Sequence, residues 1–90
     1  MSEDPNITVY RANRAKTLLE DELISGSLAK LEADYIQAWG LTGPRDTDAR
    51  ERLWQAVQVV RKFRDHLSMV VMDGKLAQAE LDAMAGTKAA

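Results

Sequence analysis

The sequence predicts an all-α domain, an antiparallel helical hairpin with one long C-terminal helix packed by two shorter N-terminal helices. Apolar residues recur at alternating steps of three and four through the second half of the chain, which is the spacing of one helix face. A cluster of chain-breaking residues, Gly40, Gly43 and Pro44, separates this stretch from a first half with similar periodicity. Ninety residues, 46% hydrophobic and 29% charged, are typical of one small folded domain.

The long helix is predicted from Thr47 to Met84, with Asp46, Thr47 and Asp48 supplying oxygens that can cap its first turn. Its apolar seam, which should face the rest of the domain, consists of Leu53, Ala56, Val60, Phe63, Leu67, Val70, Gly74, Ala77, Leu81 and Met84. Gly74 could also end the helix, because glycine is the usual C-cap residue. The unbroken seam favours continuity through Gly74, and residues 85–90 are expected to form a tail.

Two shorter helices are predicted upstream, at residues 8–24 and 27–39, after a loose arm at residues 1–7. Ser25, Gly26 and Ser27 are expected to separate them, because a glycine inside a helix costs about 1 kcal/mol relative to alanine. Their apolar stripes are Ala12, Ala15, Leu19 and Leu23 in the first helix and Leu28, Leu31, Tyr35 and Ala38 in the second. Residues 40–46 form the hairpin turn.

The two tryptophans flank this turn. Trp39 ends one arm of the hairpin and Trp54 lies early in the other. Antiparallel pairing of the arms would bring the indoles together, so both are expected to be largely buried and close to one another.

The C-terminal half of the long helix carries a second apolar stripe opposite its seam: Met69, Met72, Leu76, Ala79 and Ala83. A chain of this length has little other structure with which to cover both faces. We therefore predict that this stripe binds a partner, either a second copy of the chain, most simply as a dimer, or another protein. Self-contact and hetero-contact demand the same apolar residues, so the sequence leaves that choice open.

No constellation of catalytic or metal-binding residues is recognisable. His66 is the single histidine and has no carboxylate at helical contact spacing, and the sequence has no cysteine. Glu20, Asp21 and Glu22 are consecutive, so in a helix they point in different directions. No glycine-rich phosphate loop occurs. The sequence therefore predicts a protein that is not an enzyme and has no catalytic residue, no metal site and no cofactor.

Basic residues and one indole share a side of the long helix: Arg50, Trp54, Arg61 and Arg64. Such a surface could contact an anionic partner, either nucleic acid or an acidic protein. Alternatively, the arginines cover Trp54 with their stems and pair with nearby acids. The net charge of −2 favours the second interpretation, since nucleic-acid-binding proteins usually carry net positive charge.

Parts of the sequence resemble small helical proteins of unassigned activity that are encoded in bacteriophages and prophages near head and portal genes. The similar segments are Tyr35–Trp39, Arg45–Thr47 with Arg50–Trp54, and His66–Val71 with Gly74–Leu76. The resemblance implies a role in virion assembly or host takeover and no catalytic residues.

Three functions follow in order of preference. The first is a non-enzymatic helical assembly or interaction protein of phage origin, the second a small inhibitor or regulator of a host enzyme, and the third a nucleic-acid packaging adaptor. The sequence shows no basic leader before an apolar segment and no apolar run long enough to span a bilayer. We therefore expect the host cytoplasm or the virion as its location and no membrane partner.

Overall fold

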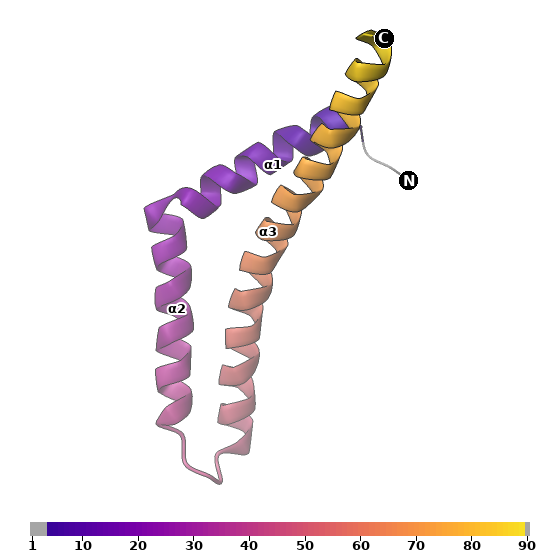
Figure 1. Cartoon of the computed structure of the whole chain (residues 1–90). Helices are drawn as coiled ribbons and strands as arrows, with labels where there is room; N and C mark the ends of the chain where they lie inside the picture. Colours follow the sequence, from indigo (N-terminus) through magenta and orange to yellow (C-terminus); the bar gives the residue numbers. More distant parts are fainter. Residues whose placement is uncertain (1–3, 90) are drawn as a thin grey trace.

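The protein folds into three helices, α1 (Pro5–Glu20), α2 (Glu22–Gly40) and α3 (Thr47–Ala89), in a computed structural model that describes residues 4–89 and the side chains of residues 4–86. Figure 1 shows α2 and α3 as the arms of a hairpin, with α1 running from the far end of α2 to cross α3. This arrangement, without a strand among the described residues, confirms the predicted all-α hairpin with two N-terminal helices packed on a long C-terminal one.

The first helix begins at Pro5 rather than at Thr8. The Asp4 carboxylate accepts a hydrogen bond from the Asn6 backbone N–H at 2.9 Å, and Pro5 occupies the first turn, where a missing N–H is no loss. Residues 5–7 of the predicted arm are therefore helical, and residues 1–3 lie outside the described part.

The break between α1 and α2 lies at Asp21, so the predicted break at Ser25 to Ser27 is wrong. Asp21 has an extended backbone, and its carboxylate accepts hydrogen bonds from the N–H groups of Leu23 and Ile24 at 2.9 and 3.0 Å. Ser25 lies inside α2 and donates its hydroxyl to the Asp21 carbonyl oxygen. A capping carboxylate is worth about 0.5–2 kcal/mol, which is enough to outweigh one interior glycine.

The third helix runs without interruption through Gly74 to Ala89, so the predicted tail is helical to that residue and only Ala90 lies outside the described part. Gly74 is buried where α1 crosses α3. A Cβ atom at position 74 would collide with the Cβ of Ala12 and lie 3.6 Å from the Thr8 carbonyl oxygen. Glycine serves a close helix crossing here and does not end the helix.

The buried core is small. Only alanines and valines among the described side chains are buried, namely Ala12, Ala15, Val57, Val60 and Ala77, and α2 contributes none. The radius of gyration is 19.2 Å, whereas a compact domain of this length would have about 12 Å. The molecule is therefore elongated and leaves an unusual share of its side chains open to solvent. Among the described residues, no helix combines the length and the apolarity needed to cross a membrane.

The predicted seams are confirmed for the most part, since every residue of the α3 seam except Phe63 and Met84 is buried or partly buried. Val57, Arg64 and Val71 face inward on α3, and Glu32 does so on α2, while several residues of the predicted stripes are exposed: Leu23, Leu31, Phe63 and Met84. Glu32 and Arg64 lie on the inner face because Glu32 pairs with arginines of α3 across the interface. A pattern based on apolar residues assigns such charges to the outside.

Candidate interaction surfaces

The predicted second stripe of the long helix lies on an open side of α3, and we call it the α3 stripe: Met69, Met72, Leu76, Ala79 and Ala83. All five of its residues are exposed, and the largest, Met69, Met72 and Leu76, are 60%, 63% and 69% exposed. Figure 1 shows the C-terminal part of α3 extending beyond its crossing with α1. The structure thus places an apolar surface on α3 that neither of the other two helices covers.

The position of α1 explains why the stripe is open. Met72 and Leu76 lie two residues before and after Gly74, the point where α1 crosses. At 3.6 residues per turn, a step of two residues corresponds to about 160° around the helix. The stripe is therefore on the side of α3 opposite to α1.

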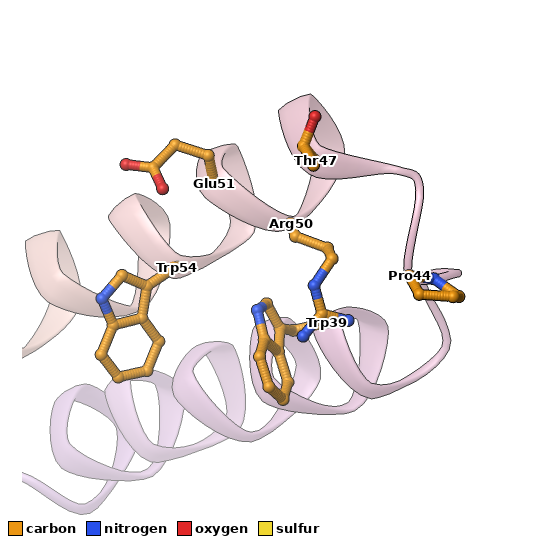
Figure 2. A pocket seen from close by; sticks show the side chains of 6 residues that line it. All are labelled: Trp39, Pro44, Thr47, Arg50, Glu51 and Trp54. Atoms are coloured by element: carbon orange, nitrogen blue, oxygen red, sulfur yellow. The ribbon is translucent and has the colours of Figure 1, made fainter.

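The second surface is a groove at the hairpin end, with a volume of about 540 Å³. It is lined by Trp39, Pro44, Thr47, Arg50, Glu51 and Trp54 (Figure 2). Both indoles line this groove, as expected from their predicted proximity. The predicted burial is wrong, since Trp39 and Trp54 are 37% and 46% exposed. The helix that could have covered them, α1, crosses α3 far away at Gly74.

Arg50 is the half-buried cation of this groove. Its guanidinium carbon lies 4.2 Å from the centroid of the Trp39 ring, and its Nη1 donates to the Thr42 hydroxyl at 3.0 Å. The Thr42 hydroxyl in turn donates to the Trp39 carbonyl oxygen at 2.6 Å. Arg50 is therefore held against the ring by a cation–π contact and a neutral hydrogen bond.

The other two arginines of the predicted basic surface point to α2. Arg61 Nε and Arg64 Nη1 lie 3.1 and 3.5 Å from Glu32 Oε1, and Arg61 also stands 5.7 Å from the Trp54 ring centroid. Of the predicted anion-contacting residues, the structure brings Arg50 and Trp54 together in the groove. Arg61 and Arg64 instead pair with Glu32 of α2 across the hairpin.

Sequence reasoning missed two residues of this region, Glu32 and Thr42. Glu32 lies four residues after Leu28 and three before Tyr35, which is the spacing of the inner face of α2, so helical periodicity could have identified it. Thr42 lies in the turn and carries no periodic signal. His66 is exposed on α3, and the described residues contain no group of three or more histidine, aspartate or glutamate side chains that could hold a metal ion.

Comparison with known proteins identifies no relative: no protein family, no curated protein and no solved structure matches this chain.

Proposed function

We propose that this protein is a non-enzymatic helical assembly protein that associates with a second copy of itself through the α3 stripe. The proposal rests on the surface that one chain leaves open. The accessible surface of the chain is 7134 Å². A compact monomer of 10.0 kDa would expose about 5,200 Å², so the excess is about 1,900 Å².

An excess of this size is enough for a stable dimer. A standard protein interface covers about 800 Å² on each partner, well within the open area. Burial of a methionine or leucine side chain contributes about 1.5–3 kcal/mol, so Met69, Met72 and Leu76 of two copies contribute on the order of 10 kcal/mol. This gain is comparable to the cost of association, about 4–15 kcal/mol, and the small side chains of Ala79 and Ala83 favour the close helix packing that would add to it.

A second copy is the simplest occupant of the stripe. The stripe of one copy can pair with the same stripe of another copy about a two-fold axis, which covers both surfaces without any further component. Methionine adapts its shape to the opposing side chain, which suits such a contact. A role in the assembly of a phage particle belongs to the same proposal and rests on the sequence resemblance alone.

The alternative functions would use other surfaces or other partners. An inhibitor or regulator would hold the stripe against a different protein and would remain monomeric by itself. A nucleic-acid adaptor needs several unpaired cations in a row, and the pairing of Arg61 and Arg64 with Glu32 disfavours it.

The test is the mass of the protein in solution. We expect light scattering after size exclusion to give a dimer mass at high micromolar concentration. The triple change Met69→Gln, Met72→Glu and Leu76→Lys should give a monomer with an unchanged far-ultraviolet circular dichroism spectrum. The matched control is Leu41→Gln, which removes an exposed leucine of the turn, 82% exposed and distant from the stripe, and should leave the mass unchanged.

Two results would contradict the proposal. One is a parent protein that is monomeric throughout the concentration range. The other is a triple variant that keeps the dimer mass, which would place the contact elsewhere.

A further inference from the structure

Arg50 is a half-buried cation for which the described part of the chain supplies no carboxylate. Ion pairs found there include those of Lys16 with Glu20, Lys30 with Asp34, and both Arg61 and Arg64 with Glu32, and none of these involves Arg50. The contacts of Arg50 itself, to the Thr42 hydroxyl and the Trp39 ring, are neutral. A guanidinium carries five N–H donors, so it retains the capacity to bind a carboxylate.

The groove around Arg50 combines this cation with apolar surface. Figure 2 shows the two indole rings on the same side of the hairpin, with the Arg50 guanidinium beside Trp39 and the Glu51 carboxylate directed away from it. Indole rings bury aliphatic side chains well, and a guanidinium binds a carboxylate by charge-assisted hydrogen bonds. The groove therefore suits a segment that presents a carboxylate next to an aliphatic side chain.

The chain carries such a segment at the corner where α1 meets α2, residues 20–23. Leu23 is 77% exposed, and the neighbouring Glu22 is exposed with no ion pair among the described residues. The 19 residues of α2 separate this corner from the hairpin end by about 28 Å, so the corner cannot enter the groove of its own chain.

We propose that the groove lined by Trp39, Arg50 and Trp54 receives the α1–α2 corner of a second copy, with Leu23 against the indoles and Glu22 paired with Arg50. This contact uses none of the α3 stripe and stands whether or not the stripe forms a dimer. Groove and corner are different surfaces, so the contact is heterologous and repeats head to tail. Combined with a stripe dimer, it would link dimers into larger assemblies.

A phosphate backbone is a poorer occupant of the same groove. The chain has a net charge of −2, and Glu32 already pairs with Arg61 and Arg64, the next two arginines of α3 after Trp54. A single unpaired guanidinium suits one carboxylate, whereas nucleic-acid binding draws its affinity from several phosphate contacts.

Tryptophan fluorescence reports on this groove alone, because both tryptophans of the sequence line it. We expect the emission of the full-length protein to change on dilution from millimolar concentration, above the range in which the stripe dimer is tested, because a contact of this small size binds weakly. The change should be the same in the α3 stripe triple variant, in which the proposed dimer contact is removed. Glu22→Gln and Leu23→Ser are both at exposed positions. Each should move the midpoint of the emission change to about tenfold higher protein concentration, because each removes one charge-assisted hydrogen bond or one buried aliphatic group.

Complementation between two variants tests the pairing directly. Arg50→Gln damages the groove and Leu23→Ser damages the corner, so each chain by itself should associate through this contact only at about tenfold higher concentration than the parent. An equimolar mixture contains one intact groove and one intact corner, and it should recover the fluorescence change. Arg45→Gln, which alters an exposed arginine of the turn outside the groove lining, is the matched control and should behave as the parent.

The outcomes decide the proposal. If Arg50→Gln alters the circular dichroism spectrum, Arg50→Lys takes its place in the mixture. Three results would each overturn the corner contact. The emission could stay constant on dilution, the emission change could be unaffected by Glu22→Gln and Leu23→Ser, or the mixture of variants could fail to recover it. A response to inorganic phosphate or to a single-stranded DNA oligomer, without a response to dilution, would assign the groove to anions.

Discussion

Replacing Gly74 by alanine tests the crossing of α1 and α3 on which the fold depends. The added Cβ would collide with the Cβ of Ala12 and lie 3.5 Å from the Ala12 Cα, so the two helices must separate. Overpacking of this kind costs about 1–3 kcal/mol, and the rigid alanine opposite places the cost near the upper end. The higher helix propensity of alanine stabilises α3 by about 1 kcal/mol, so the free energy of unfolding should fall by about 2 kcal/mol in total.

The assay is chemical denaturation of the α3 stripe triple variant as background, so that association does not contribute to the free energy of unfolding. Gly26→Ala is the matched control, because Gly26 lies inside α2 and a Cβ there meets no atom within 4 Å. It should stabilise the protein by up to about 1 kcal/mol. The two glycine substitutions are thus expected to have opposite signs.

A double variant identifies the contact. Ala12→Gly should destabilise by about 2 kcal/mol, through the lost methyl group and the lower helix propensity. Ala12→Gly combined with Gly74→Ala moves one methyl group across the interface and should be close to the parent, with a coupling of several kcal/mol between the two positions. If Gly74→Ala is as stable as the parent, or if the two effects simply add, the close crossing is not what holds α1 in place.

Further changes test the other contacts of the fold. Asp21→Ala removes the cap of α2 and should cost about 1 kcal/mol in urea denaturation, whereas Glu22→Ala beside it should be nearly neutral, and equal effects would contradict the capping role. Glu32→Gln leaves Arg61 without its carboxylate and should cost about 1 kcal/mol at low ionic strength and less in molar salt, so a salt-independent loss would point to packing instead. Trp54→Ala should cost about 1–2 kcal/mol, less than the 3–5 kcal/mol of a core tryptophan, because the side chain is 46% exposed; a larger loss would show that solvent does not reach it. The thermal midpoint of the parent should rise with protein concentration and that of the α3 stripe triple variant should not, since association stabilises the folded state by mass action.

The features that could be predicted are local in sequence. Glycines and a proline mark the turn, where the Asp46 carboxylate accepts the Gly43 N–H at 3.0 Å, and regular apolar spacing marks α3 as one helix. The exposure of Met69, Met72 and Leu76 also followed from spacing, because a second stripe on one helix has no partner in so short a chain. These inferences need only the geometry of a single helix.

The features that could not be predicted depend on which elements meet. Glu32 and Arg61 are 29 positions apart and become partners only when the hairpin closes, so their inward position is invisible to a pattern that places charges outside. The exposure of both indoles depends on where α1 crosses α3. The break at Asp21 has a local cause, because the capping carboxylate there outweighs the breaking tendency of Gly26, and residue types alone do not rank these two effects.

The crossing at Gly74 connects the stability of the fold with the exposure of the α3 stripe. At Gly74 the backbone of α1 lies close against α3, on the side opposite Met72 and Leu76. Displacing α1 from this point loosens the fold but brings no other element over the stripe. Gly74→Ala introduced into the parent chain should therefore lower the free energy of unfolding while the mass of the associated species stays the same. A change in that mass would mean that the crossing also shapes the contact surface, because α1 would then have to reach the stripe or its flank.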